Sequence, residues 1–466
     1  MNHEIKCKSS VTIKCFTIMK TIYITLLVLL FPALAEKGKA QITIDTLGNT
    51  IVAIETVVDS SKFAGGYDSG PWDLHAGPDS RLWYTNKKMV NCYDPLTGAI
   101  DTLLEIPSGY IMSITTHLDF ANQPFVYLTV DTSSYYGQGT LIKVFRYTYD
   151  AVNDTLLNPL FLLQWGHGGE HSGGRLLFGA DTMLYVTTAE YYWQIDTLFN
   201  NSGKVLRLHP DGSVPVDNPR PDYTWTWGHR NPQGIVQTPN GNIIASEYGM
   251  INDELNLIEP GNHYGWFVFD GTNCFQPVDT CNYYQQFCKF PIDIGQNPCS
   301  GITWYDHPAI PEFHGVVEAV TGINQGIYVY GLNANMDSVI NKTGYVKYEY
   351  GRVRDVVAFP DGSLYFIAYD RSMPRINKIY NPLFSSLPPE KNNRYQIYPN
   401  PSDGIVNVTG AAGNKNVTLT LSDLSGKIVT NHVWKGEPLQ MDVAPGCYLL
   451  TISDVDKKQT FKWIKY

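Results

Sequence analysis

A repeated hairpin pattern constrains the fold of this chain more than any other feature of its sequence. In each copy, an apolar–polar run precedes a turn rich in Pro, Asp, Asn or Gly and then an aromatic or apolar run, which is typical of a β-hairpin. Five copies are clear: Pro71–Asn86, Ile114–Val130, Gly174–Thr188, Gly234–Glu247 and Arg354–Tyr369. A sixth, weaker copy lies at Gly301–Tyr330. Unevenly spaced hairpins over residues 41–380 predict an all-β propeller with loop insertions, because a β-sandwich would not hold so many.

The composition changes after Tyr380, which marks a domain boundary. Residues 381–394 are rich in Pro, Ser, Glu and Asn and are expected to form a linker. Residues 395–466 alternate apolar strands with turns at Pro399–Gly404 and Leu424–Lys427. This pattern predicts a small C-terminal β-sandwich.

Residues 1–40 have the features of a signal peptide. Lys20 precedes the apolar run Ile22–Leu34, which is too short to span a bilayer as a stable helix. We expect cleavage after Ala40, and Met19 is an alternative start. The prediction is an exported mature chain without a membrane span, and a short membrane anchor is the alternative.

Four cysteines fall in one segment, at Cys274, Cys281, Cys288 and Cys299. Clustered cysteines in an exported chain predict disulfides. A zinc site is the alternative, but the wide spacings lack the C-x-x-C pairs of structural zinc. Three disulfide connectivities remain open. The other two cysteines of the mature chain, Cys92 and Cys447, lie in different predicted domains and are expected to be free thiols.

The net charge excludes one class of partner. At −10 it argues against nucleic-acid binding, because phosphate recognition requires a basic face. The 43% apolar residues and 31 tyrosines are typical of a folded, β-rich protein.

The stretch Gly228–Trp266 concentrates the polar chemistry of the chain. Arg230 and Asn231 can donate hydrogen bonds to a planar, oxygen-rich ligand. Ile243–Ser246 is expected to be a buried strand. The loop Glu247–Glu254 gathers carboxylates and backbone carbonyls, the hard oxygen ligands that calcium prefers. The alternative is two strands joined by a polar turn with solvated charges.

Several words of the sequence resemble one known family. GHRNPQG, ASEYG, DELNLIEPG and NHYGW occur in this order within Gly228–Trp266, and related words precede them at Ser172–Thr188 and Ser202–Pro219. They resemble the soluble, quinone-dependent aldose (glucose/sorbosone) dehydrogenases, over about Pro71–Tyr380. The resemblance implies a six-bladed β-propeller that binds pyrroloquinoline quinone (PQQ) and calcium.

The resemblance assigns the role of general base to His171. A histidine can take a proton near neutral pH, although a lone histidine before a strand is usually structural. In the family the matching histidine takes the proton of a sugar's anomeric hydroxyl while a hydride passes from C1 to the quinone. The flanking acid Glu170, which stands where some relatives have Asp, could fix the tautomer of His171, and His167 is a competing candidate.

The resemblance also implies quinone contacts by Arg230, Asn231, Arg352 and Arg354. A fixed cation would stabilise the negative charge that a quinone gains with hydride. The spacing of Arg352 and Arg354 places both on one face of a regular strand, where they could clamp carboxylates. A surface turn is the alternative for the first pair, and a solvated strand edge for the second.

The calcium ligands implied by the resemblance are Glu254, the backbone carbonyl of Tyr264, and the carbonyls of Gly249 and Met250. Calcium that bridges to the quinone would polarise one of its carbonyls as a Lewis acid. Relatives usually have Gly-Pro where this chain has Gly249-Met250, in a loop that is one residue shorter here.

Two further departures concern polar contacts to the quinone. The segment Ser108–Phe120 lacks a Gln that the family often carries, and Asn333 lies near the position of a Lys that contacts the quinone in many relatives. Each missing charged hydrogen bond would weaken PQQ binding by about 1.5–3 kcal/mol.

The C-terminal residues carry a second resemblance. YPNPSDG at Tyr398–Gly404, SDLSGKIV at Ser422–Val429 and the basic end Lys462–Lys465 resemble the type A sorting domain of the Bacteroidetes type IX secretion system. This implies an interaction with that machinery, carriage across the outer membrane, and a secreted or cell-surface location. A generic adhesive β-sandwich is the alternative.

Together these features predict an exported PQQ-dependent aldose dehydrogenase that oxidises the C1 hydroxyl of sugars to lactones. Two alternatives share the propeller. One is a non-catalytic surface propeller that binds glycans or proteins, since fold alone does not decide function. The other is a calcium-dependent lactonase, which would leave the arginine pairs Arg230-Asn231 and Arg352/Arg354 unexplained. The sugar and the electron acceptor do not follow from the residues.

Overall fold

The computed structural model divides into two compact units, Met1–Asn381 and Pro382–Tyr466. It describes residues 42–63, 70–132, 141–166, 171–191, 200–296, 298–322, 324–370, 373–384, 395–398, 404–409, 417–423, 427–435, 437–444, 446–453 and 458–465. The predicted signal peptide and most of the predicted linker lie outside these ranges. Within them, no helix is long and apolar enough to cross a membrane.

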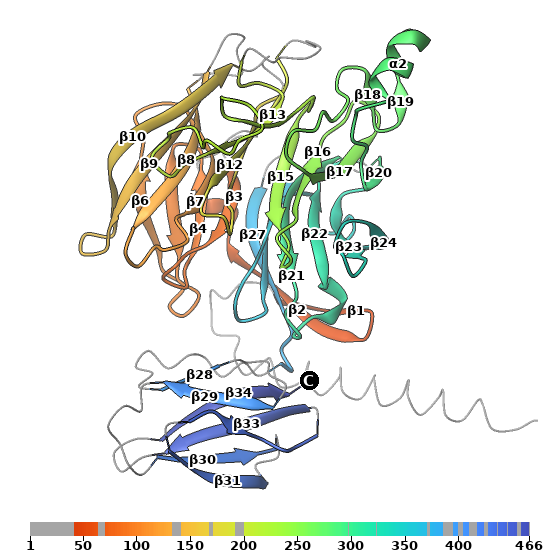
Figure 1. Ribbon diagram of the computed structural model, residues 1–466. Coiled ribbons are helices and arrows are strands. Elements are labelled where there is room, and N and C mark those ends of the chain that lie inside the picture. The colour runs from red at the N-terminus through yellow and green to blue at the C-terminus, as the bar shows by residue number, and fades with distance from the viewer. Residues whose placement is uncertain are drawn as a thin grey trace, which may run out of the picture. The chain divides into compact units, whose positions relative to one another are not determined.

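The described part of the first unit is built of six antiparallel sheets of four or five strands, with a two-stranded sheet in an insertion and few helical residues (Figure 1). In strand order they are β3 (Pro71–Ala76), β4 (Leu82–Asn86), β5 (Met89–Tyr93), β6 (Ile100–Glu105); β7 (Tyr110–Thr116), β8 (Phe125–Asp131), β9 (Leu141–Asp150), β10 (Thr155–Gly166); β11 (Gly173–Phe178), β12 (Leu184–Thr188), β13 (Lys204–Leu208), β14 (Thr224–Trp227); β15 (Pro232–Gln237), β16 (Ile243–Glu247), β17 (Asp253–Ile258), β20 (Asp293–Gly295); β21 (Cys299–Tyr305), β22 (Gly315–Val320), β23 (Gly326–Leu332), β24 (Val339–Tyr345); and β1 (Ile42–Leu47), β2 (Thr50–Val58), β27 (Met373–Tyr380), β26 (Leu364–Asp370), β25 (Arg352–Ala358). The predicted all-β class and all five hairpins are confirmed.

The sheets are arranged around a closed ring of inner strands. Strands β3, β7, β11, β15, β21 and β25 each pack against the next, and β25 packs against β3. Each inner strand has a register shift near its first residues. The N-terminal strand β2 pairs with β27, so the last sheet contains both ends of the first unit.

Apolar side chains between neighbouring sheets form the core. One buried cluster joins Trp83 and Val90 of the first sheet to Ile114 and Leu128 of the second, and equivalent clusters fill the spaces between later sheets. Strands such as β12 and β22 are buried along their whole length. Because both faces are covered, these strands are continuous apolar runs with few polar interruptions.

A buried ion cluster lies at the centre of the ring. The guanidinium of Arg175 (β11) contacts the carboxylate of Asp73 (β3) and lies 3.2 Å from that of Asp355 (β25). Its Nε donates to the carbonyl of Gln233 (β15) at 2.8 Å. A Cβ on Gly301 (β21) would lie 1.5 Å from the Asp355 carboxylate, so this strand approaches as only glycine permits.

The two carboxylates of the cluster also reach backbone groups of neighbouring inner strands. Asp73 accepts a hydrogen bond from the N–H of Ile114 in β7 at 2.8 Å, and Asp355 accepts one from Leu74 in β3 at 2.7 Å. All six inner strands therefore meet at one level. Burial raises the pKa of Asp355, and the charge of Arg175 opposes that shift.

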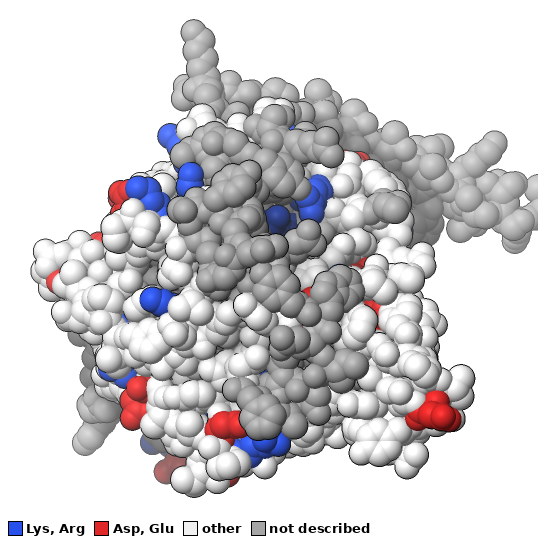
Figure 2. Space-filling view, turned by 90° about the horizontal axis from the view of Figure 1, so that it is seen from above, with Lys and Arg blue, Asp and Glu red and all other residues white. Residues whose placement is uncertain are grey.

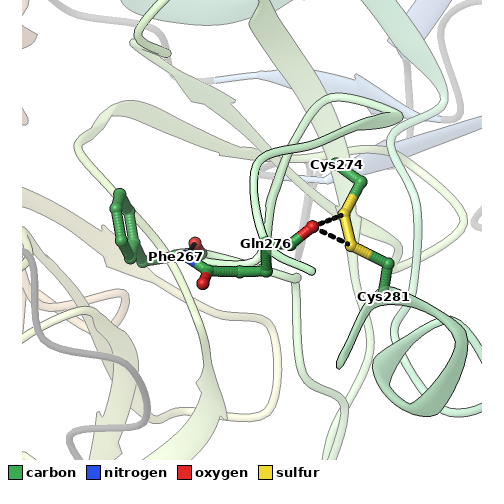
Figure 3. Close-up of a disulfide and its surroundings, with 4 residues drawn as sticks. All are labelled: Phe267, Cys274, Gln276 and Cys281. Carbon is green, nitrogen blue, oxygen red and sulfur yellow. Dashed lines mark hydrogen bonds between the residues drawn. A yellow bond between two sulfur atoms is a disulfide. The ribbon is translucent and has the colours of Figure 1, made fainter. Parts of the chain in front are cut away.

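Between β17 and β20 the chain forms an insertion with the short strands β18 (Phe269–Asp270) and β19 (Asn273–Cys274) and the helix α2 (Val278–Tyr284). A disulfide joins Cys274 to Cys281 (Figure 3). The carbonyl oxygen of Gln276 lies 3.3 Å from both sulfur atoms. The predicted disulfide class is confirmed for this pair.

For the other two clustered cysteines the prediction of a disulfide is wrong. The sulfur of Cys288 lies 3.4 Å from Nδ1 of His263, whereas Cys299 is buried in the inner strand β21. Cys299 lies apart from the other three cysteines because it belongs to β21 and to the buried core, not to the insertion. Cys92 is a buried free thiol, as expected, and the side chain of Cys447 lies outside the described residues.

The second unit contains two antiparallel sheets in its described residues. In strand order they are β28 (Gln396–Tyr398), β29 (Ile405–Thr409), β32 (Leu439–Gln440); and β31 (Ile428–Trp434), β30 (Val417–Ser422), β33 (Gly446–Ser453), β34 (Lys458–Lys465). Residues of both sheets, among them Val406, Leu419 and Trp463, share one buried apolar cluster.

The first unit contains a second buried polar cluster, which connects β20 to β22–β24. The hydroxyl of Tyr330 donates to the carboxylate of Glu318 at 2.5 Å, and the ammonium of Lys342 lies 2.9 Å from the carboxylate of Asp293. Burial raises the pKa of Glu318 to about 8, against the opposing effects of Tyr330 and Lys342.

Replacing Arg175 by Met should lower the free energy of unfolding by about 3–5 kcal/mol, because two carboxylates remain buried without their counter-ion. Urea denaturation would measure the change. Lys88→Met is the control: Lys88 forms an exposed pair with Glu105 at 2.9 Å, and its loss should cost at most about 1 kcal/mol. Equal effects of the two substitutions would contradict a central role for the ion cluster.

Glu318→Gln should flatten the dependence of stability on pH. The pKa of Glu318 is higher in the folded chain than in the unfolded chain, so the folded state holds this proton more tightly. Its contribution to stability is full below about pH 4.5 and is lost as pH rises to about 8, by up to about 1.4 kcal/mol per pH unit. Calorimetry between pH 5 and 8 should show a steeper fall in Tm for the wild type, and parallel curves would refute the assignment.

Candidate active site

The ion cluster lies between the two ends of the ring. On one side of it is a cavity of about 400 Å³, lined by residues that come after the cluster in each inner strand, among them His75, Thr116 and His117. Arg175 and Asp355 form the wall between this cavity and the other end. The predicted base and quinone contacts come before the cluster residues in the sequence of their strands, and none of them lines the cavity. They are His171, Arg230, Asn231, Arg352 and Arg354. The candidate site is therefore at the N-terminal ends of the inner strands.

His171 lies immediately before β11 and is buried. Its Nδ1 is 3.0 Å from Oε1 of Glu190, which is also buried and follows β12. Gly173 then turns the chain into the strand with φ of 61°, and a Cβ there would lie 2.7 Å from the backbone nitrogen of Ala189. The sequence therefore holds His171 against the neighbouring strand with a carboxylate at one ring nitrogen.

The flanking acid predicted to fix the tautomer of His171 was Glu170. Glu170 and the competing candidate His167 lie outside the described residues, and the described partner is Glu190, nineteen residues further on. Sequence reasoning missed Glu190. Its position directly after the buried run Leu184–Ala189 is the signal that could have found it.

A second histidine–glutamate pair occupies the next sheet. Nδ1 of His229 is 2.8 Å from Oε2 of Glu247, and Nε2 is 2.9 Å from the hydroxyl of Thr226. The ring of His229 stacks on that of Tyr264, 4.5 Å away, and the side chain is fully buried. Both nitrogens of His229 thus face protein atoms, which makes it a structural histidine.

Arg230 lies beside this pair, directly before β15. Its backbone N–H donates to Glu247, and its Nη1 donates to the carbonyls of Tyr248 and Gly249 at 2.8 and 2.7 Å. The guanidinium lies 5.3 Å from the ring of Tyr248 and 5.2 Å from that of Trp266. Burial lowers the pKa of Arg230, and nearby carboxylates oppose the shift. The result is a buried cation between aromatic rings.

His171 and Arg230 come together at Tyr248. The rings of His171 and Tyr248 are 6.5 Å apart, and the guanidinium of Arg230 covers the same tyrosine. The carbonyl of Arg230 also accepts a hydrogen bond from the N–H of Glu190 at 2.7 Å. The structure therefore brings two sequence-predicted residues from different sheets to one place.

Asn231 has a supporting position between the same two strands. Its side-chain oxygen accepts hydrogen bonds from the N–H of Gly173 at 3.2 Å and from Nε2 of Gln233 at 2.8 Å. It therefore ties the start of β15 to the start of β11, which carries His171.

Arg352 and Arg354 begin β25, but their surroundings differ. Nε of Arg352 donates to the carbonyl of Thr321 at 3.1 Å. The guanidinium of Arg354 lies 3.8 Å from the ring of Trp72. The pairing register of β25 shifts between Val353 and Asp355, and such a bulge interrupts the regular alternation on which the prediction of a shared face was based.

The residues expected to bind calcium have protein partners of their own. Glu254 accepts hydrogen bonds from the N–H of Gly271 at 2.6 Å and from Asn256 at 2.9 Å. Burial and the nearby charge of Glu247 raise its pKa. The hydroxyl of Tyr264 donates to the carbonyl of Leu257 at 2.5 Å.

The Gly249-Met250 turn faces two charges. The Gly249 carbonyl accepts from Arg230, whereas the N–H of Met250 donates to the carboxylate of Asp270 at 2.8 Å. Asp270 is a second residue that sequence reasoning missed. It lies in a part of the sequence without a recognisable motif, so only the fold reveals its role.

In the view from above, a few basic side chains lie in the upper middle of the face, and other basic side chains lie with acidic ones toward its left and lower edges (Figure 2).

Comparison with known proteins shows which families the two parts of the chain match. Residues 68–376 match the family described as glucose / sorbosone dehydrogenase, and residues 396–466 match a secretion system C-terminal sorting domain. Quinoprotein glucose dehydrogenase B of Acinetobacter calcoaceticus is 32% identical over 270 residues, which are 49% of this chain and 56% of that protein. The aligned part is thus little more than half of that relative.

Two further proteins resemble the chain over a greater share of their own length. The aldose sugar dehydrogenase of Escherichia coli is 25% identical over 343 residues, 65% of this chain and 88% of that protein. The solved structure of the PQQ-bound aldose sugar dehydrogenase of Streptomyces coelicolor superposes with a TM-score of 0.57 at 24% identity, covering 73% of this chain and 99% of the other. Because the family match extends over more than half of its residues, the chain belongs to the glucose/sorbosone dehydrogenase family.

Proposed function

We propose that this chain is an exported quinoprotein that oxidises the anomeric C1 hydroxyl of aldose sugars to lactones, with hydride transfer to PQQ and His171 as the general base. One observation carries the proposal: His171, paired with Glu190, and the buried guanidinium of Arg230 lie beside the same ring, that of Tyr248. A proton acceptor next to a fixed cation suits a reaction in which a proton leaves the substrate and negative charge develops on an acceptor.

The contact with Glu190 defines what His171 can do. When Nδ1 carries the proton and donates a hydrogen bond to the carboxylate of Glu190, the free lone pair of the imidazole is on Nε2. Nε2 accepts the proton of the C1 hydroxyl while the C1–H bond breaks and its electron pair leaves with the hydride. Glu190 then stabilises the imidazolium and keeps the ring in place. PQQ, when bound, supplies the acceptor for the hydride.

The residues at this end of the ring fit a planar polyanion such as PQQ. Arg230 lies between the rings of Tyr248 and Trp266, and Arg354 lies against Trp72. Aromatic faces can stack on a fused ring system, and guanidinium groups match carboxylates. We assign quinone contact to Arg230, Arg352 and Arg354, and Asn231 would position the strand starts.

The calcium proposal rests on the donor set. Glu254 is a buried carboxylate next to Glu247, and a cation would offset the burial that raises its pKa. The backbone carbonyl of Tyr264 would complete that site. A calcium ion that bridges to the quinone would be bound by the backbone carbonyls of Met250 and Gly249. The Gly249 carbonyl also accepts a hydrogen bond from Arg230.

We further propose that the ring of sheets is the six-bladed β-propeller implied by the family, followed by a C-terminal β-sandwich. The packing of the inner strands into a closed ring and the apolar cluster shared by the two C-terminal sheets support this. Residues 1–40 would direct export, residues 381–394 would link the domains, and residues 395–466 would carry the chain to the type IX machinery, for secretion or surface attachment.

The decisive experiment uses the mature chain with calcium and PQQ. Dye reduction with a panel of aldoses should show sugar-dependent turnover, and titration should show saturable quinone binding. A chain that binds no quinone at micromolar PQQ would overturn the enzyme assignment and leave the non-catalytic propeller as the explanation. Hydrolysis of lactones without PQQ would favour the lactonase alternative.

His171→Ala should lower kcat by about 10²–10⁴-fold, the usual contribution of a general base, and should leave the dissociation constant of PQQ nearly unchanged. Glu190→Gln should also lower kcat, because the imidazole loses the carboxylate that orients it and that would stabilise its protonated form. His209→Ala is the control, since this histidine lies in a turn after β13. Retained activity in His171→Ala would refute the assigned base.

A further inference from the structure

The loop between β16 and β17 cannot be held in place by burial of its side chains. Met250 and Ile251 are 42% and 51% exposed, although both are large and apolar. The shape of this loop must therefore come from hydrogen bonds of its backbone. Its position matters because Tyr248, at its start, is the residue that His171 and Arg230 share.

One carboxylate, that of Asp270, accepts three of the five backbone N–H groups of the loop 248–252. The N–H of Gly249 donates to Asp253 at 3.2 Å, and that of Tyr248 donates to the carbonyl of Asn231 at 3.0 Å. Oδ1 of Asp270 accepts from Met250 at 2.8 Å, and Oδ2 accepts from Ile251 and Asn252, both at 2.9 Å. The amide of Asn252 also donates to the carbonyl of Asp270 at 2.9 Å. Asp270 is 1% exposed and belongs to the short strand β18. Hydrogen bonds to an ionised acceptor are about twice as strong as neutral ones.

The other side of the loop faces a cation. The carbonyls of Tyr248 and Gly249 accept from Nη1 of Arg230. Between the two charges the chain folds so tightly that a Cβ on Gly249 would lie 1.8 Å from the carbonyl oxygen of Asn252 and 2.7 Å from Asp270. The peptide group between Gly249 and Met250 therefore has its carbonyl on a buried cation and its N–H on a buried anion.

We propose that Asp270 is a positioning residue: its carboxylate sets the conformation of the loop 248–252 before any ligand binds and so builds the wall of the cofactor site next to Arg230. The identity of that cofactor rests on the proposed function, whereas the order of the loop does not. Asp270 supplies this anchor from β18, a short strand of the insertion.

Hydrogen–deuterium exchange of the chain without cofactor tests the first step. In Asp270→Ala the amides of residues 250–252 should exchange at least about tenfold faster, since each loses its charged acceptor. Asp270→Asn keeps one acceptor oxygen and should give an intermediate result, and it serves if the alanine variant does not fold. Asp279→Ala is the control, because it removes an exposed carboxylate from the same insertion.

Titration with PQQ, followed by its fluorescence, tests the second step. The dissociation constant should rise by about tenfold or more in Asp270→Ala, less in Asp270→Asn, and not in Asp279→Ala. Unchanged exchange of residues 250–252 in both Asp270 variants would overturn the inference. Faster exchange with unchanged PQQ affinity would overturn the link to the cofactor site. A wild-type chain that binds no PQQ would overturn the proposed function instead, while the exchange result still decides how the loop is held.

Discussion

The guanidinium of Arg175 is the point at which the inner strands of the first unit meet. Two carboxylates, Asp73 and Asp355, and a carbonyl of β15 surround it. Buried charges are tolerated only with well-placed partners, because taking each ion out of water costs several kcal/mol. This requirement fixes the height of each inner strand relative to the others. The apolar clusters between sheets add attraction, but non-directional contacts alone would tolerate sliding of one sheet along another.

The level of this ion cluster decides which residues face each end of the ring. His171 and Arg230 precede it and meet at Tyr248, whereas His75 and His117 follow it and line the cavity beyond. The same logic of paired buried charges recurs around the site. Glu190 holds His171, Glu247 holds His229, and Asp270 holds a loop whose carbonyls face Arg230. The site is thus built of buried polar pairs near strand ends, with the aromatic rings of Tyr248, Trp266 and Trp72 beside its guanidinium groups.

Much of the fold could be predicted, because hairpins are local. The five copies from Pro71–Asn86 to Arg354–Tyr369 each contain a complete turn and both strands, so pattern and turn chemistry suffice. The prediction that Arg352 and Arg354 share one face assumed a regular strand. A bulge interrupts β25 there, and a bulge depends on pairing with the neighbouring strand, which the local sequence does not reveal. Disulfide pairing failed for Cys288 and Cys299 because spacing says nothing about which cysteine enters the core.

By itself the sequence determined the all-β class and the positions of the hairpins along the chain, because these follow from local period and turn chemistry. His171 and Arg230 were predicted through the resemblance of their sequence motifs to a known family. Only the tertiary structure decided that Glu190 is a partner of His171, that His229 is structural, and that Asp270 anchors the loop beside Arg230. Each of these is a contact between segments far apart in the sequence or folded back on one another, and such contacts exist only after the strands have been placed around the ring.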